Sequence, residues 1–263
     1  MPETAFYLYC FARMGNLPVL DGTGVDGEHP LVVRRFGEIA AVLSTVSLAD
    51  FCGPEAEARM EDISWLGVRA FRHEAAIEYV MKHTPVFPAR FGTIFSSLEK
   101  VESMVAEYRE TIARFLDRMV EHEEWGVKGV LKREIALREL QSRYQAGTDF
   151  ASLPPGLRYL QEQKARIAVE KELHIWLEKT CETVANDLRS SAAEMKIRKV
   201  LSSADSESDS EVVLNWAFLV PRSARGDLRE RVERASAELA NQGLHFELTG
   251  PWPPYNFTPQ LVD

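Results

Sequence analysis

The sequence predicts an α+β fold in two domains, residues 1–123 and 124–263, and three observations lead to this prediction. The chain has 263 residues, and folded domains commonly contain about 150. Its first half places β-rich apolar runs mostly before amphipathic helices. Its second half runs strand, helices, strand, helix and strand, which favours a ferredoxin-like sandwich, here modified by a long helix and a proline-rich C-terminal tail.

The first domain is predicted to build a small sheet from its opening residues. Residues 5–11 are apolar on both faces, as in a strand that is buried on both sides. Residues 15–30 are polar and rich in glycine, which predicts a loop. Two β-rich runs, 31–36 and 39–46, are separated only by Gly37 and Glu38, so we expect a tight hairpin at this point.

Two helices of this domain carry apolar stripes. The first is expected to begin at Asp62 or Ser64, which are favourable N-cap residues. Its stripe, and therefore its expected core face, consists of Trp65, Val68, Phe71, Ala75 and Tyr79. The second helix, 98–122, repeats apolar residues at alternating spacings of three and four. This pattern fits a coiled-coil partner or the domain's own sheet, and its short length favours the sheet.

The second domain is predicted to end in a helix, a strand and an irregular tail. Its elements in chain order are a strand at 125–131, helices at 133–144 and 157–199, a strand at 212–220, a helix at 222–242 and a strand at 244–249. The acidic, serine-rich residues 202–211 predict a solvated or disordered loop. Gly243 is expected to end the last helix. Three prolines within residues 251–254 argue against a regular helix or a central strand.

Composition argues against several classes of partner. The net charge of −9 argues against general nucleic-acid binding, which needs a basic surface. The three cysteines form no C-x-x-C pair, so we expect neither a zinc ribbon nor a redox motif, and the chain resembles a reduced, cytoplasmic protein. Neither a signal-peptide pattern nor a run of about 18 apolar residues is present, so no membrane partner is expected.

The sequence carries no complete catalytic motif, which predicts that the chain is not an enzyme. His73 and Glu74 begin like a metalloprotease H-E-x-x-H motif, but Ile77 stands where the second histidine is needed. The sequence contains no P-loop, no G-x-G-x-x-G and no G-x-S-x-G. We therefore assign no catalytic, cofactor-binding or metal-binding residues and expect no cofactor. An active site assembled from distant residues stays open as an alternative.

Four parts of the sequence carry distinctive motifs: FYLYCF with RRFGEIAAVLSTV, HTPVFPARFGTIF, EWGVKGVL with GLRYLQEQK, and LTGPWPPYNF. The segments at 83–95 and 248–257 are the most specific, because they are too irregular to be amphipathic patterning. In their order and spacing the four parts together resemble the gas-vesicle GvpF/GvpL family over nearly the whole chain.

The resemblance implies an accessory protein for gas vesicles, which are gas-filled, protein-walled compartments that give buoyancy. The implied partners are the very hydrophobic major shell protein and other accessory proteins, and the implied location is the cytoplasm, at the vesicle. The protein would assist nucleation or assembly of the wall, with incorporation as a minor component left open. Strand addition and a helix laid in a groove both stay open as binding modes. The competing hypotheses are a ligand-binding regulatory module and an uncharacterised enzyme on a ferredoxin-like domain.

Four residues within the two specific segments are candidates for partner binding: Arg90, Phe91, Trp252 and Tyr255. Arginine and aromatic side chains are enriched at the centres of protein interfaces. The alternative for Arg90 is an internal ion pair, and the alternative for Phe91 is a place in the core. For Trp252 and Tyr255 the alternative is a tail that folds back and caps one domain.

Overall fold

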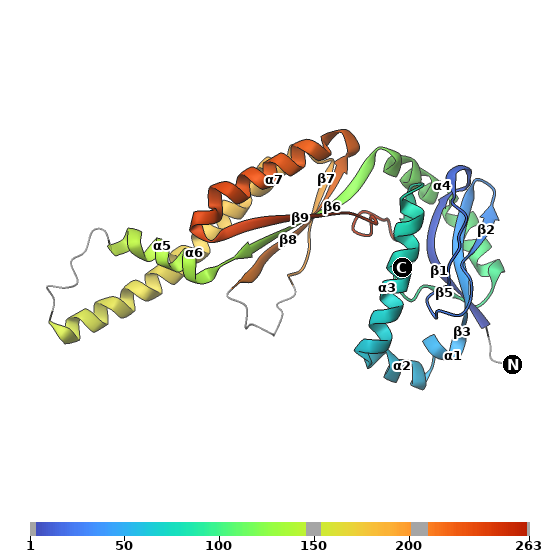
Figure 1. Cartoon of the computed structure of the whole chain (residues 1–263), viewed down its shortest axis with the longest axis horizontal. Coiled ribbons are helices and arrows are strands. Elements are labelled where there is room, and N and C mark those ends of the chain that lie inside the picture. The colour runs from blue at the N-terminus through green and yellow to red at the C-terminus, as the bar shows by residue number, and fades with distance from the viewer. Residues whose placement is uncertain (1–3, 146–153, 201–209, 262–263) are drawn as a thin grey trace. The chain divides into compact units, whose positions relative to one another are not determined.

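The computed structural model describes residues 4–145, 154–200 and 210–261 and has the mixed helix and sheet content of an α+β protein (Figure 1). The chain forms two compact units, one of residues 1–123 with 252–263 and the other of residues 124–251. The sequence analysis placed 252–263 in the second domain, whereas the structure groups this tail with the first unit. The tail returns because its side chains bond to and pack on the first unit, as described below.

The first unit contains an antiparallel sheet in the order β2-β3-β1-β4, with β5 also paired to β1. The hairpin predicted at Gly37 and Glu38 is confirmed, since β2 and β3 flank these two residues. The strands are β1 (Thr4–Arg13), β2 (Val32–Phe36), β3 (Ile39–Ser47), β4 (Val86–Pro88) and β5 (Ile94–Phe95).

The helices of this unit contact both faces of the sheet. They are η1 (Met14–Asn16), α1 (Leu48–Phe51), α2 (Pro54–Glu61), α3 (Ile63–Met81) and α4 (Leu98–Val120). Asp62 caps α3 as predicted, because its carboxylate accepts from the amides of Ser64 and Trp65. α4 buries most of its predicted stripe and contacts β1 and β4, so it packs on its own sheet.

Because of a β-bulge in β1, Tyr7 and Phe11 lie on opposite faces of the sheet. The register with β3 shifts between Leu8 and Cys10, so the simple alternation of side chains is broken there. Before the bulge Tyr7 packs against His73 of α3. Beyond it Phe11 packs against Phe87 of β4, whose ring in turn contacts α4. One face of β1 therefore packs against α3 and the other faces α4.

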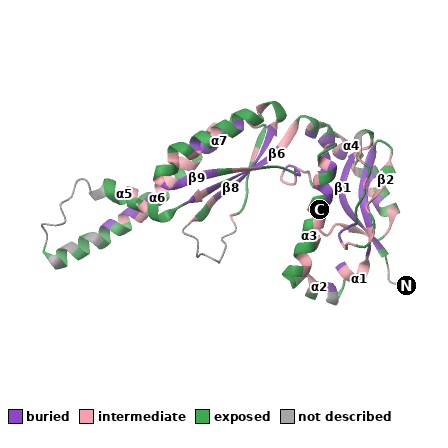
Figure 2. Cartoon of the chain, viewed as in Figure 1, coloured by how far each residue is buried: buried purple, intermediate pink, exposed green. Residues whose placement is uncertain are grey.

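The core face predicted for α3 was wrong for four of its five residues. The helix buries His73, Ala76, Ile77 and Val80 against the sheet. Trp65 packs on the core as predicted, but the rest of the stripe lies on roughly the opposite side of the helix, and Figure 2 shows exposed residues along α3. The error arises because the buried side includes a histidine, which an apolar pattern does not count.

The second unit contains a sheet in the order β7-β8-β6-β9 with helices between its strands. Its strands are β6 (His122–Leu131), β7 (Glu194–Ile197), β8 (Glu211–Pro221) and β9 (Leu244–Trp252). Its helices are α5 (Arg133–Gln145), α6 (Pro155–Arg189), η3 (Arg222–Ala224), α7 (Arg225–Leu239) and η4 (Ala240–Gln242). Trp125, Trp216 and Phe218 lie in the core of this unit.

Two predicted boundaries in the second unit need correction. The long helix was expected to reach residue 199, but α6 ends at Arg189 and β7 follows, a strand that the sequence analysis missed. β9 extends to Trp252, through Pro251, because it is an edge strand and needs no amide donor on its outer side.

Gly243 ends the preceding helical segment in the left-handed conformation, as predicted. Most of the predicted acidic loop at 202–211 lies outside the described residues.

Candidate protein-binding surface

A chain of hydrogen bonds joins α3, β1 and the tail inside the first unit. The Tyr255 hydroxyl donates to the Glu74 carboxylate at 2.9 Å and lies 3.2 Å from Nε2 of His73. The other ring nitrogen, Nδ1, lies 3.0 Å from the hydroxyl of Tyr7, which itself accepts from the Gly92 amide at 3.0 Å. With Nε2 protonated and Nδ1 free, His73 donates to the Tyr255 hydroxyl oxygen and accepts from the Tyr7 hydroxyl, so every donor in this chain has an acceptor.

Burial sets the protonation of this network. It lowers the pKa of His73 to about 4, so the imidazole is neutral at pH 7, as the hydrogen-bond chain requires. Burial also raises the pKa of Tyr7 and of Tyr255, so both hydroxyl groups keep their protons. The pKa of the Glu74 carboxyl is raised by burial too, although the bond from Tyr255 acts against this rise. The network thus holds the tail by neutral and singly charged hydrogen bonds.

Removing the Tyr255 hydroxyl tests whether this network holds the tail. We expect Tyr255→Phe to lower the free energy of unfolding of the first unit by about 1–3 kcal/mol, because His73 and Glu74 each lose a buried partner. Amides of the tail should also exchange with solvent faster. As a matched control, Tyr79→Phe removes an exposed hydroxyl that donates to the Val19 carbonyl at 3.3 Å, and it should change little. Equal effects of the two changes would contradict this role of Tyr255.

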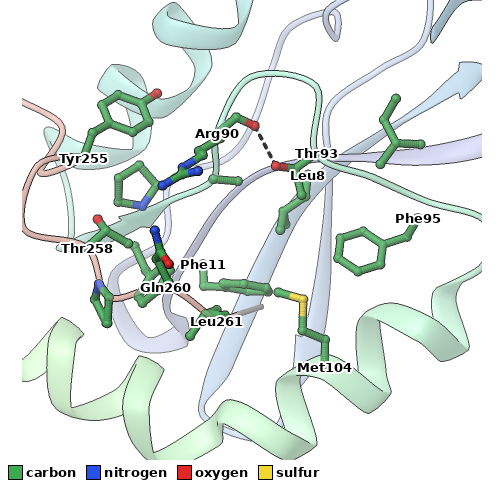
Figure 3. A pocket seen from close by; sticks show the side chains of 15 residues that line it. Leu8, Phe11, Arg90, Thr93, Phe95, Met104, Tyr255, Thr258, Gln260 and Leu261 are labelled. Atoms are coloured by element: carbon green, nitrogen blue, oxygen red, sulfur yellow. Dashed lines mark hydrogen bonds between the residues drawn. The ribbon is translucent and has the colours of Figure 1, made fainter. Parts of the chain in front are cut away.

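A pocket of about 680 Å³ lies between β1, the turn from β4 to β5, α4 and the tail (Figure 3). Its apolar lining comes from all of these elements and includes Leu8, Phe11, Phe87, Phe95, Met104 and Leu261. Arg90, Thr258 and Gln260 contribute polar side chains, and Figure 3 shows Arg90 on the side of the pocket toward Gln260. Every lining residue belongs to the first unit.

The backbone of Arg90 is fixed by a tight turn. Its carbonyl accepts from the amide of Thr93 at 3.1 Å and from the Thr93 hydroxyl at 2.7 Å. Within the described residues, no ion pair or hydrogen bond to the Arg90 guanidinium is found, and this side chain is exposed. The pocket therefore has an apolar interior and a cation at its edge.

The side of α3 that faces away from the sheet forms an exposed apolar surface, which we call the α3 outer face: Val68, Phe71, Ala75 and Tyr79. The side chains of Val68, Phe71 and Tyr79 are 50%, 75% and 41% exposed. Val19, itself exposed, adjoins this face through its bond with the Tyr79 hydroxyl. Residues at these spacings form a continuous stripe on a helix, so the face is a single surface and not a scatter of side chains.

The structure brings three of the four candidate residues together. Arg90 and Tyr255 line the same pocket, and the half-buried Phe91 ring packs against the rings of Tyr7 and His73. Trp252 lies at the end of β9, is 40% exposed and does not line the pocket. The sequence analysis noted His73 only as half of a failed metal motif and did not predict its role in the network.

Within residues 4–145, 154–200 and 210–261, no group of three or more histidine, cysteine, aspartate or glutamate side chains is placed to hold a metal ion. Among the same residues, no helix has the length and apolar character needed to cross a membrane.

Comparison with known proteins points to one family. The model of the gas vesicle synthesis protein GvpL/GvpF family matches residues 5–259. Gas vesicle protein L of Streptomyces sp. (strain CB03234) is 27% identical over 257 residues, which cover 95% of this chain and 91% of the relative. Gas vesicle protein L1 of Halobacterium salinarum is 25% identical over 273 residues, covering 97% and 90%.

Solved structures agree with the fold. The crystal structure of GvpF from Anabaena sp. PCC7120 superposes with a TM-score of 0.68 at 17% identity, over 98% of this chain and 97% of that one. GvpF from Microcystis aeruginosa gives a TM-score of 0.64 at 16% identity, over 97% and 99%. Both superpositions extend over nearly the whole chain, so they include both units and show the fold of each.

Proposed function

Because the chain belongs to the gas vesicle synthesis protein GvpL/GvpF family, which supports a role in gas vesicle formation, we propose that it binds the hydrophobic major shell protein. In this role it is a non-enzymatic accessory protein that assists nucleation or assembly of the vesicle wall, as a transient partner or as a minor component. Other accessory proteins are its further partners. It acts in the cytoplasm, at the growing vesicle, and the proposal requires no cofactor.

The observation that carries this proposal is the α3 outer face. Val68, Phe71 and Tyr79 expose large apolar or aromatic surface to water. Removing apolar surface from water contributes roughly 25 cal/mol per Å², so such a stripe favours association with another apolar surface. In this proposal, a shell subunit that has not yet joined the wall exposes apolar surface of its own. Covering that surface with the α3 outer face would keep the subunit from aggregating.

The stripe supports helix packing as the binding mode. Val68, Phe71, Ala75 and Tyr79 recur at spacings of three and four, which is the spacing of a helix that packs against another helix. Strand addition would use the edge of a sheet, and the edge strands are β2 and β4 in the first unit and β7 and β9 in the second. β4 has only three residues, all of them buried, and ends in Pro88, whereas β2 and β9 are longer. The exposed apolar stripe of α3 is therefore the reason to propose helix packing, and strand addition stays open as the alternative.

Co-expression with the cognate major shell protein tests the proposal. We expect the wild-type chain to co-purify with the shell protein and to keep it soluble. Phe71→Ser, a change at an exposed position, should reduce the amount captured severalfold while leaving the unfolding temperature nearly unchanged.

The control removes a similar apolar side chain elsewhere. Ile167 of α6 is 70% exposed, and Ile167→Ser should capture the shell protein as well as the wild type does. No co-purification with the wild type would contradict shell-protein binding. Normal capture by Phe71→Ser would reject the α3 outer face as the surface responsible.

We also infer that the second unit is a modified ferredoxin-like domain. Its elements run β6, then α5 and α6, then β7, β8, α7 and β9, which is a β-α-β-β-α-β order with an additional helix. The hydrogen-bonded order β7-β8-β6-β9 places the first and third strands side by side at the centre and supports the same assignment. Because this fold hosts many functions, the inference carries no activity with it.

A further inference from the structure

We propose that the pocket in the first unit is a binding site for an amphiphilic carboxylate, a molecule with an apolar chain and a single anionic head. This site is distinct from the α3 outer face and does not rest on binding of the shell protein. The proposal follows from the size of the pocket, the chemistry of its walls and the position of one cation.

The size and walls of the pocket fit a small apolar molecule. Its volume of about 680 Å³ lies within the range of about 300–1,000 Å³ that is usual for ligand sites. Phe11 and Leu8 of β1, Phe95 of β5 and Met104 of α4 contribute apolar side chains from three separate elements. Aromatic and thioether groups in this arrangement accommodate a flexible hydrocarbon chain.

The charge at the pocket selects the head group. Among the described residues that line it, Arg90 is the only charged side chain, and no carboxylate is present to repel an anion. A guanidinium offers paired donors that match the two oxygens of a carboxylate. The side-chain amide of Gln260, on the tail side, supplies a further donor, whereas the Thr258 hydroxyl already donates to the Pro254 carbonyl.

The elements around the head-group position are held in place before any ligand arrives. Thr93 bonds twice to the Arg90 carbonyl, which fixes the turn that carries the guanidinium. Tyr255 ties the tail to His73 and Glu74, which fixes the opposite wall. Such preorganisation lowers the entropy that is lost on binding.

Calorimetric titration of the full chain with decanoate, below micelle-forming concentrations, tests the proposal. Decanol and decyltrimethylammonium serve as probes with the same chain and a neutral or cationic head. We expect one saturable decanoate site with weaker binding of decanol and no binding of the cation. Arg90→Ala should weaken decanoate about tenfold, the scale of one charge-assisted hydrogen bond, and leave decanol unchanged.

Two further variants separate the pocket from non-specific effects. Arg114→Ala removes an exposed arginine of α4 that does not line the pocket, and it should bind decanoate like the wild type. Met104→Trp fills the pocket with a larger side chain, so it should lose both decanoate and decanol while unfolding at a temperature close to that of the wild type. Circular dichroism of each variant confirms that it is folded.

Three outcomes would overturn the proposal. The first is the absence of saturable decanoate binding to the folded wild type. The second is equal weakening by Arg90→Ala and Arg114→Ala, which would indicate general attraction between charges. The third is unchanged binding by a folded Met104→Trp variant, which would place the ligand outside this pocket.

Discussion

Acidification from pH 7 towards pH 4 is expected to destabilise the first unit by up to about 3 kcal/mol through His73 alone. Its pKa is about 4 in the folded chain, because burial penalises the charged imidazole, against 6.5 when it is exposed. Between these values the unfolded chain binds more protons than the folded one. Stability from the neutral histidine is therefore complete above pH 6.5 and falls as the pH approaches 4.

The carboxyl group of Glu74, beside His73, changes the stability of the fold with pH in the opposite direction. The pKa of Glu74 is raised by burial, so the folded chain binds its proton more readily than the unfolded chain does. Lowering the pH through this range stabilises the fold through Glu74 and partly masks the effect of His73. Comparing the wild type with His73→Gln isolates the histidine, because glutamine keeps one donor and one acceptor but does not titrate.

Hydrogen exchange of the β1 amides, corrected for the intrinsic effect of pH, reports on the first unit alone. The wild type should lose protection on acidification more steeply than His73→Gln does. Parallel curves for the two proteins would show that His73 does not titrate as its burial requires.

The strands and helices were largely predictable because most of them have a clean apolar period. β8 is apolar apart from Glu211 and Asn215, and α4 carries an apolar stripe along its length, so the structure has both close to their predicted positions. β7 was missed because it is short and largely exposed, and its residues extend the apolar period of α6. The hydrogen bonds that pair it with β8 are a tertiary effect that local pattern does not contain.

The site was less predictable because it depends on a local irregularity and on distant contacts. The bulge in β1 places Phe11 in the pocket, whereas strict alternation from Tyr7 would turn it toward α3. The contact between Tyr255 and His73 joins residues that are 182 positions apart. The irregular motifs at 83–95 and 248–257 singled out Arg90 and Tyr255 as candidates. Only the structure shows that the two residues line the same pocket.

Replacing Gly24 by alanine is expected to lower the free energy of unfolding of the first unit by about 3 kcal/mol or more. A Cβ atom at this position would lie 2.4 Å from the Ser44 hydroxyl oxygen and 2.8 Å from that of Tyr9. Both side chains are fully buried and hydrogen-bonded to each other at 2.8 Å, and Tyr9 also accepts from the Val25 amide at 2.6 Å. Urea unfolding followed at the β1 amides measures the loss.

The matched control lies two residues earlier in the same loop. A Cβ at Gly22 would meet only a Leu31 methyl group at 3.8 Å, so Gly22→Ala should be nearly neutral. Neither glycine has a positive φ angle, so backbone strain does not separate the two variants, and only the crowding at Gly24 does. Because the same loop carries Val19 beside Tyr79, displacement of the loop at Gly24 should also weaken capture of the shell protein. Equal stability of the two variants would show that the loop shifts without breaking the Tyr9 bonds.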